Sequence, residues 1–212
     1  MIISSELEAY TSSYSSSLAP LLQEVIDFTV ANHTCAQMIS SKEQGLLLQF
    51  ISRMAQPKRI LEIGTFTGFS GLCLASGLAK DGELHTIELR AEDAATAQSY
   101  FNRSTYKEKI YLHIGDAAKI IPTLQEQWDI IFIDADKTGY VDYYELVLPN
   151  LNPNGLVIVD NVLFKGEVLK EPVTGKNPKA ITTFNNYVKN DTRVDQVMLT
   201  VRDGLTLIRK RI

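Results

Sequence analysis

The sequence has few cysteines and few histidines. Its 212 residues include two cysteines and three histidines. Cys35 and Cys73 have no metal-ligand spacing and cannot build a disulfide framework, which favours a reducing compartment. The histidines His33, His85 and His113 are scattered along the chain. The last two fall in or beside predicted strands, where strand packing or hydrogen bonding is the expected role.

Long apolar runs and an excess of positive charge are also absent. No segment approaches the roughly 18 apolar residues of a membrane-spanning helix, and the N-terminus has no basic region followed by an apolar one. The formal net charge of -4 gives no electrostatic support to a nucleic-acid partner. We therefore expect a cytoplasmic globular protein that binds neither membranes nor nucleic acid.

Strand and helix patterns alternate along the chain. After a polar, serine-rich start, helices are expected at about 18–32 and 41–54, and then at 91–103, 117–125, 140–148 and 178–189. Strands are expected at 83–88, 110–115, 128–134, 155–160, 194–201 and 205–209, after a first strand that begins at 59. This alternation predicts an α/β fold with a doubly wound, mostly parallel sheet, helices on both faces and a terminal antiparallel hairpin. We predict one domain over 1–212, with an N-terminal helical segment (1–56) and a Rossmann-like core (57–212).

The stretch from Arg59 to Ser70 organises the rest of the chain. It has the pattern of a short strand, a glycine turn and a helix start. Gly64 and Gly68 allow a ligand to approach the backbone, and the helix start offers unpaired N–H groups. The glycines do not form the G-x-G-x-x-G of dinucleotide sites, and Glu62 would repel a pyrophosphate. It suits the cationic S-adenosylmethionine, so the motif is similar to the first motif of class I methyltransferases. The alternative is a turn whose glycines serve packing only.

Acidic residues stand at or beside the ends of five predicted strands, where open parallel sheets bind ligands. They are Glu62, Glu88, Asp116, Asp134 and Asp160. Glu88 follows Gly64 at a distance at which an acid commonly holds the ribose hydroxyls of S-adenosylmethionine or of a nicotinamide cofactor. Asp116 and Ala117 are expected beside an adenine edge.

Asp134, Asp160 and Asn161 follow two strands that we expect to be neighbours. Two carboxylates and an amide oxygen form a hard ligand set that suits Mg²⁺, with Ca²⁺ or Mn²⁺ as alternatives. Without a cation, two buried carboxylates would repel each other. The competing interpretation is a pair of N-caps for the following helices.

The motifs, taken together, resemble the cation-dependent O-methyltransferases of the caffeoyl-CoA and catechol type. The similarity runs from about Met38 to the C-terminus. It is carried by MISSKEQG at 38–45, LEIGTFTGFS at 61–70, IDADK at 133–137, DNVL at 160–163, Gly166 and DGLT at 203–206. Two departures, Phe164 and the loop 165–179, lie beside the expected acceptor pocket, so the acceptor cannot be carried over.

The resemblance implies a seven-stranded sheet with its last strand inserted antiparallel, S-adenosylmethionine as methyl donor, and a homodimer. It implies a divalent cation on Asp134, Asp160 and Asn161, and a catalytic base at Lys137 beside Asp134. The predicted cofactor-binding set is Met38, Ser40, Glu62, Gly64, Thr65, Phe66, Ser70, Glu88, Asp116, Ala117 and Asp134.

The predicted reaction is in-line methyl transfer from S-adenosylmethionine to a hydroxyl of a small vicinal diphenol, catechol or caffeoyl-like. A cation on two neighbouring hydroxyls would acidify and orient them, and Lys137 would take the proton. One alternative is a nicotinamide-dependent oxidoreductase, which Glu62 and the missing dinucleotide motif disfavour. The other is a non-catalytic S-adenosylmethionine-binding protein, which would not need the lysine; Lys137 would then be a surface charge in a loop.

Overall fold

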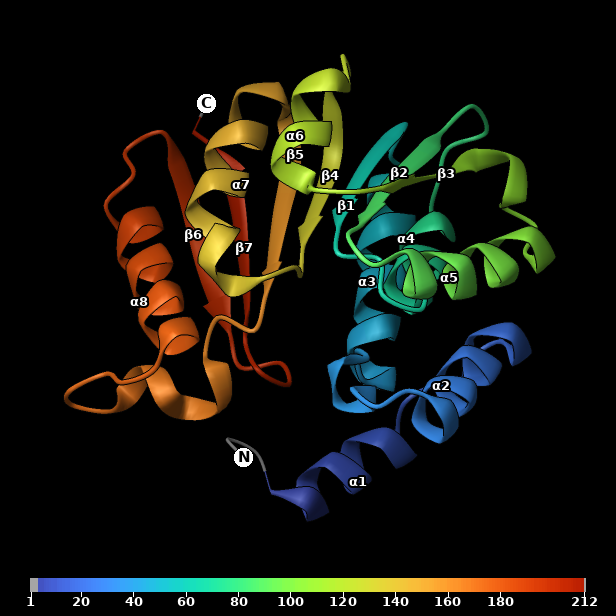
Figure 1. The fold of residues 1–212 in the computed structure, drawn as a ribbon, viewed down its shortest axis with the longest axis horizontal. Coiled ribbons are helices and arrows are strands. Elements are labelled where there is room, and N and C mark those ends of the chain that lie inside the picture. The colour runs from blue at the N-terminus through green and yellow to red at the C-terminus, as the bar shows by residue number, and fades with distance from the viewer. Residues whose placement is uncertain (1–3, 212) are drawn as a thin grey trace.

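The computed structural model describes residues 4–211, so the predicted domain's extreme ends, 1–3 and 212, lie outside the described residues. Seven strands form one sheet in the order β3-β2-β1-β4-β5-β7-β6 (Figure 1). The strands are β1 (Arg59–Ile63), β2 (Glu83–Glu88), β3 (Ile110–Ile114), β4 (Trp128–Ile133), β5 (Leu151–Asp160), β6 (Val194–Leu199) and β7 (Leu205–Lys210). The first five pair in parallel, whereas β7 lies antiparallel between β5 and β6. This confirms the predicted fold class.

Helices cover both faces of the sheet (Figure 1). They are α1 (Ser5–Ser13), α2 (Pro20–Asn32), α3 (Lys42–Ala55), α4 (Phe69–Ala75), α5 (Ala91–Arg103), α6 (Ala117–Ile120), α7 (Tyr140–Val147) and α8 (Lys176–Lys189). The short 3-10 helices are η1 (Ala36–Met38), η2 (Lys107–Lys109), η3 (Ile121–Thr123), η4 (Lys137–Gly139), η5 (Leu148–Asn150) and η6 (Phe164–Leu169). Across residues 4–211, no helix combines the length and apolarity that crossing a bilayer requires.

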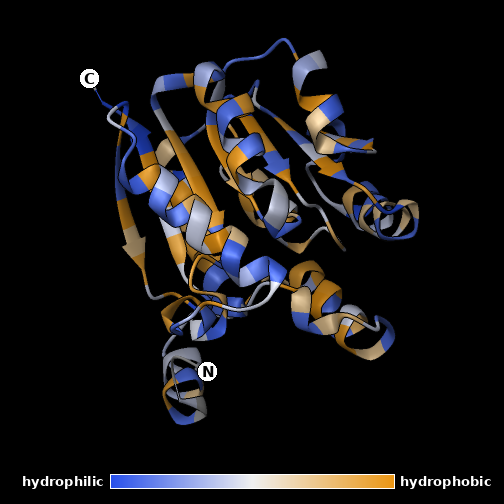
Figure 2. Cartoon of the chain, turned by 60° about the vertical axis from the view of Figure 1, so that its left-hand side comes forward, coloured by the Kyte–Doolittle hydropathy of each residue, from blue (hydrophilic) through white to orange (hydrophobic). Residues whose placement is uncertain are grey.

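The central strands are apolar on both sides because each side packs under helices (Figure 2). In β4, Ile131 and Ile133 belong to the core under α6, α7 and α8. The alternating residues Ile130 and Phe132 belong to the core that α2, α3, α4 and α5 cover. All four are fully buried. The continuous apolar run of this strand therefore reflects burial on two faces.

Some local elements differ from the sequence prediction. Helix α1 lies in the serine-rich start, where weak apolar periodicity gave no signal; Ser4 caps it and accepts a hydrogen bond from the N–H of Leu7. Strand β5 begins at Leu151, ahead of the predicted residue 155, because Leu151 pairs with Trp128 of β4. The loop before α8 contains η6, which was not predicted.

Gly64 stands where β1 and β4 deliver their loops to the same edge of the sheet. Its φ is +101°, a backbone conformation that favours glycine. A Cβ atom built there would lie 2.2 Å from the carbonyl oxygen of Asp134. The first motif's glycine is thus required by the close approach of the turn to the backbone that follows β4.

Candidate active site

A cavity of about 740 Å³ lies at the carboxyl ends of the parallel strands. Most of the predicted site residues line it: Met38, Ser40, Gly64, Thr65, Phe66, Ser70, Glu88, Asp116, Ala117, Asp134, Lys137 and Asn161. Glu62 and Asp160 are fully buried behind the wall and do not line the cavity. One hollow therefore unites residues from the first motif, the β2 end, the β4 end and the segment before α3.

The carboxylate of Glu88 holds the glycine turn in place. Its Oε2 accepts a hydrogen bond from the N–H of Phe66 at 2.8 Å, and its Oε1 accepts one from the N–H of Arg90 at 2.9 Å. Phe66 has a φ of +50° and its ring meets that of His33 edge-on, with centroids 4.6 Å apart. Glu88 thus faces the cavity from a fixed position at the end of β2.

Glu62 lies deeper than the sequence prediction placed it. Its Oε2 accepts a hydrogen bond from the hydroxyl of Thr86 at 2.5 Å, and Thr86 in turn contacts the hydroxyl of Thr65. Burial raises the pKa of Glu62 to about 7. The carboxylate does not line the cavity, and the expected contact between Glu62 and the donor stays a prediction.

Lys137 is held at the cavity wall by two acceptors. Its Nζ donates to Oδ1 of Asp134 at 2.8 Å and to the hydroxyl of Tyr140 at 2.7 Å. The Tyr140 hydroxyl donates in turn to the backbone carbonyl of Asp160 at 2.9 Å. Tyr140 is fully buried, so its hydroxyl is an acceptor in a fixed position. The predicted base is therefore a positioned group and not a free surface charge.

The Asp160 carboxylate is enclosed by donors from three parts of the chain. Oδ1 accepts from the N–H of Asn161 at 2.6 Å, and Oδ2 accepts from Nε2 of Gln44 at 2.7 Å. Nη1 of Arg202 lies 3.9 Å from Oδ2. Burial, reinforced by the charge of Asp134, raises the pKa of Asp160 well above its ordinary value. A cation between these acids would relieve that cost.

Neither Asp134 nor Asp160 caps a helix. The cap of η4 is Asp136, which accepts from the N–H of Gly139 at 3.1 Å, and Asp116 caps α6. The N-cap interpretation of the pair is therefore wrong. Among residues 4–211, no three His, Cys, Asp or Glu side chains form a group that could hold a metal ion. The predicted cation ligands are Asp134, Asp160 and Asn161. This set contains only two such side chains, because its third member is an amide.

The donor chemistry of this set suits a hard cation. Nδ2 of Asn161 donates to Oδ2 of Asp203 at 3.3 Å, which leaves the amide oxygen as the end available to a cation. The backbone of Asn161 has a φ of +58°, which asparagine tolerates better than most residues. Carboxylate and amide oxygens are the ligands that Mg²⁺ and Ca²⁺ prefer.

The family model described as O-methyltransferase matches residues 11–211. The chain belongs to the O-methyltransferase family. It is 32% identical to "Probable caffeoyl-CoA O-methyltransferase 1" of Dictyostelium discoideum, over 95% of this chain and 90% of that protein. It is 36% identical to "Catechol O-methyltransferase" of Niastella koreensis, over 79% of this chain and 80% of that protein.

A solved structure agrees with this assignment. The S-adenosylhomocysteine-bound methyltransferase PaMTH1 of Podospora anserina superposes with a TM-score of 0.90 at 29% identity, covering 99% of this chain and 97% of that one. The predicted family and the predicted S-adenosylmethionine-dependent O-methyltransferase activity are confirmed. Both alternatives, the nicotinamide oxidoreductase and the non-catalytic binding protein, give way to an O-methyltransferase.

Sequence reasoning missed three residues of the O-methyltransferase site. Gln44 reads as a helix-start residue, Tyr140 as an apolar core position of α7, and Arg202 as part of a hairpin turn. Arg202 donates from Nη2 to the carbonyls of Gln37 and Ile39, at 3.0 and 2.6 Å, and so anchors the segment that carries Met38. Each of these roles depends on contacts between distant parts of the chain.

Proposed function

We propose that this O-methyltransferase transfers a methyl group from S-adenosylmethionine to a hydroxyl of a small vicinal diphenol, with help from a divalent cation. The observation that carries the proposal is that Lys137 and Asp134 stand in one cavity wall with the glycine turn. A donor held at the turn and an acceptor held near Lys137 would then share a single hollow. In-line displacement needs that shared placement.

The proposed cofactor-binding residues fall into four groups. The glycine turn, with Gly64 and Ser70, would receive the donor's amino-acid part, and Glu88 would accept from the ribose hydroxyls. Asp116 and Ala117 would flank the adenine. Met38 and Ser40 close the cavity from the N-terminal side. A sulfonium donor supplies an activated methyl group, so the protein's own task is to align it and exclude water.

Asp134, Asp160 and Asn161 would hold the cation, with Mg²⁺ as the first candidate and Ca²⁺ or Mn²⁺ as alternatives. A bound cation acidifies and orients a pair of adjacent hydroxyls. Lys137 would accept the phenolic proton at Nζ once it has given up its own proton, and Tyr140 keeps that nitrogen at the wall. Because only two neighbouring hydroxyls can chelate, vicinal diphenols should react and single phenols should react poorly.

A methylation screen tests the proposal directly. The protein is stripped of metal and given S-adenosylmethionine, with catechol-type or single phenols, with and without Mg²⁺, and methylated product is measured by mass spectrometry. We expect product only from vicinal diphenols and only with cation. Full activity in excess EDTA would move the function to a metal-independent methyltransferase. Equal methylation of single phenols would contradict the proposal that the acceptor binds the cation through two adjacent hydroxyls.

We also propose a cytoplasmic homodimer that acts on small phenols without nucleic-acid or membrane partners. The two cysteines, Cys35 and Cys73, are free, as in a reducing compartment. The N-terminal helices expose large apolar side chains, among them Tyr14 at 78% and Met54 at 83%. A light-scattering mass equal to the 23.7 kDa monomer at micromolar concentration would contradict the dimer.

A further inference from the structure

The side chain of Gln44 does not make the contact that its position in α3 predicts. It is the third residue of α3, and Ser41 caps the helix by accepting from the N–H of Gln44 at 3.2 Å. In a capping box, the third residue's side chain reaches back to the backbone of the cap. Here Nε2 of Gln44 instead donates to Oδ2 of Asp160 at 2.7 Å, across 116 residues of sequence.

This contact is made without solvent. Gln44 and Asp160 are both fully buried. The other end of the amide, Oε1, is buried and has no hydrogen-bond partner among the described residues. Turning the amide over would place that oxygen against the carboxylate, where both atoms are acceptors. The one satisfied side-chain contact of Gln44 is therefore its bond to Asp160.

The bond completes a two-point hold on the Asp160 carboxylate. Asn161 fixes Oδ1 with its backbone N–H, which the chain itself positions at the end of β5. Gln44 fixes Oδ2 from α3, on the other side of the site. Together the two donors set the plane of the carboxylate. Gln44 does not line the cavity, so it has no access to donor or acceptor.

We propose that Gln44 is a positioning residue for the cation: it orients Asp160 and thereby sets the affinity of the site formed with Asp134 and Asn161. The inference rests on the proposed cation-dependent function. Partners that orient metal-binding side chains commonly change metal affinity by about 10–100-fold when they are removed. Because donor contacts are assigned to other residues, donor affinity should not follow.

The test compares two buried glutamines of the same helix. Gln44→Met keeps the length and unbranched shape of the side chain and removes its hydrogen bond. Gln49→Met is the matched control, because Gln49 is buried and its side chain bonds away from Asp160: Oε1 accepts from Nη2 of Arg53 at 3.0 Å and Nε2 contacts Sγ of Cys73 at 3.8 Å. Metal-free protein is titrated with Mn²⁺, and free Mn²⁺ is followed by electron paramagnetic resonance. Calorimetry with S-adenosylhomocysteine measures the donor site.

We expect Gln44→Met to weaken Mn²⁺ binding by about 10–100-fold, with S-adenosylhomocysteine affinity unchanged, and Gln49→Met to change neither. Unchanged Mn²⁺ affinity in folded Gln44→Met, or an equal loss in Gln49→Met, overturns the positioning role. If the wild-type protein binds no Mn²⁺, the cation site itself is contradicted. This outcome differs from failure of the Gln44 role, in which the wild-type protein binds Mn²⁺ and Gln44→Met binds it equally well. If Gln44→Met does not fold, Gln44→Asn keeps a buried amide that is one methylene too short; retained Mn²⁺ affinity there also overturns the inference.

Discussion

The ammonium group of Lys137 lies 2.8 Å from Oδ1 of Asp134. Both side chains are largely buried, with 13% and 17% of their surface exposed. Nζ of Lys137 donates to the carboxylate in this contact, whereas a base has to accept a proton at the same nitrogen. The proposed base and the proposed cation ligand are therefore linked. A cation bound to Asp134 would change the contact between Asp134 and Lys137.

Lys137→Met should slow methyl transfer and leave both binding sites intact. General-base assistance typically contributes about 10²–10⁴-fold, so we expect a loss of that size in single-turnover rate. The loss should shrink as the pH rises toward the pKa of the phenol, about 10, because the acceptor then ionises without help. Rates measured across this pH range, with calorimetry for donor and cation, check both parts.

The control for this experiment is Lys189→Met, which alters an exposed lysine at the end of α8. It should retain the wild-type rate. A Lys137→Met deficit that stays constant from neutral to alkaline pH would contradict the role of base and leave Lys137 with a purely structural one.

Glu88→Ala should weaken S-adenosylmethionine binding. Hydrogen bonds to a charged group contribute about 1.5–3 kcal/mol, which corresponds to roughly tenfold to a hundredfold in affinity. The substitution also frees the N–H of Phe66 and so loosens the glycine turn. Calorimetry on this variant and on Glu92→Ala, an exposed acid of the first turn of α5, separates the site effect from a general charge effect. Unchanged affinity in Glu88→Ala would remove Glu88 from the donor site.

Gly64→Ala should destabilise the protein more than Gly166→Ala. Both glycines have positive φ, +101° and +79°, and that strain alone costs roughly 1–2 kcal/mol for an alanine. A Cβ at Gly64 would also overlap the carbonyl of Asp134, whereas a Cβ at Gly166 meets nothing within 4 Å. Overpacking adds about 1–3 kcal/mol, so urea unfolding should rank Gly64→Ala clearly lower. Equal losses would show that the turn relaxes around the new methyl group.

Much of the fold follows from local patterns in the sequence. The predicted bounds of β2, 83–88, and of α5, 91–103, agree with the structure. In both elements the spacing of the apolar residues and the residues at the two ends indicate the same bounds. The helix expected at 117–125 is shorter in the structure, because Pro122 interrupts it: α6 ends at Ile120 and η3 follows. Helix α1 escaped prediction because its cap and acidic first turn are not accompanied by a clear apolar stripe.

Residues of the candidate site could be predicted where acidic side chains lie at or beside strand ends, as at Glu88, Asp116 and Asp134, which line the cavity. It was not predictable where a side chain's partner lies far along the chain. Gln44 and Arg202 are local helix-start and turn residues by pattern, and only the packing of α3 and the last hairpin beside β5 brings them to Asp160. The depth of a side chain behind a cavity wall, as for Glu62, likewise depends on the packed fold.

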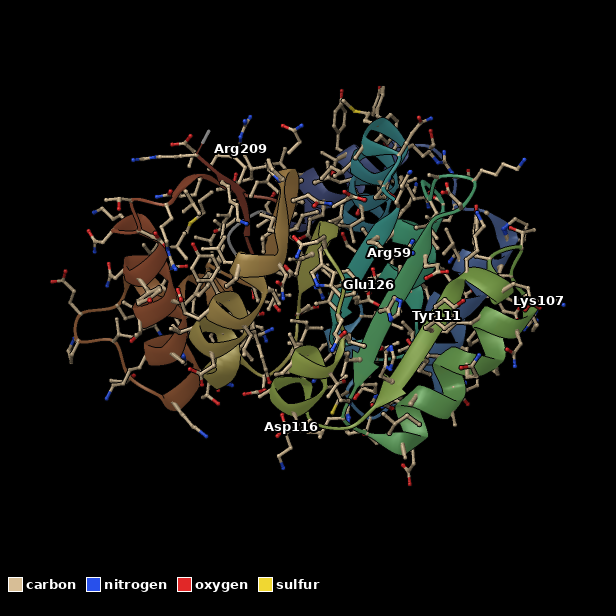
Figure 3. The ribbon with its side chains drawn as sticks, turned by 90° about the horizontal axis from the view of Figure 1, so that it is seen from above. Arg59, Lys107, Tyr111, Asp116, Glu126 and Arg209 are labelled. Carbon is tan, nitrogen blue, oxygen red and sulfur yellow. The ribbon has the colours of Figure 1, made fainter. Side chains whose placement is uncertain are left out.

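The stacked histidines His85 and His113 should make the protein less stable in mild acid. Nδ1 of His85 lies 3.1 Å from Nε2 of His113, an arrangement in which one ring donates and the other accepts. His85 also stacks on the ring of Tyr111 of β3, which Figure 3 labels. Burial, and for His85 the neighbouring His113, lowers the pKa of both below 6.5.

Because the unfolded chain takes up these protons first, the stability that the pair contributes is present above about pH 6.5 and falls as the pH drops below it. His85→Gln should remove part of this dependence. Urea unfolding at about pH 7.5 and about pH 5.5 measures the difference for wild type and variant, and all other titrating groups are common to both. An equal pH dependence in the two proteins would contradict the assignment.

Asp160→Asn should separate stability from function. The asparagine oxygen can accept from the N–H of Asn161, as Oδ1 of Asp160 does at 2.6 Å. Its Nδ2 would then face Gln44, whose amide can turn and present the unpaired Oε1. Both side-chain contacts of residue 160 are kept and a buried charge disappears, whereas Nε2 of the turned Gln44 loses its partner, so the melting temperature should stay close to that of the wild type.

The cation site should fail in the same variant. An amide is a weaker ligand than a carboxylate, and because replacing an orienting partner already costs about 10–100-fold, we expect Mn²⁺ affinity to fall by more than about 100-fold. Turnover should then match that of chelated wild-type protein, and moderate Mg²⁺ should not restore it. S-adenosylmethionine should still bind, since Asp160 does not line the cavity. Calorimetric unfolding, Mn²⁺ titration and donor calorimetry on one preparation test all three expectations. A stable Asp160→Asn protein with full cation-dependent turnover would exclude Asp160 from the ligand set and leave Asp134 and Asn161 as the only proposed ligands.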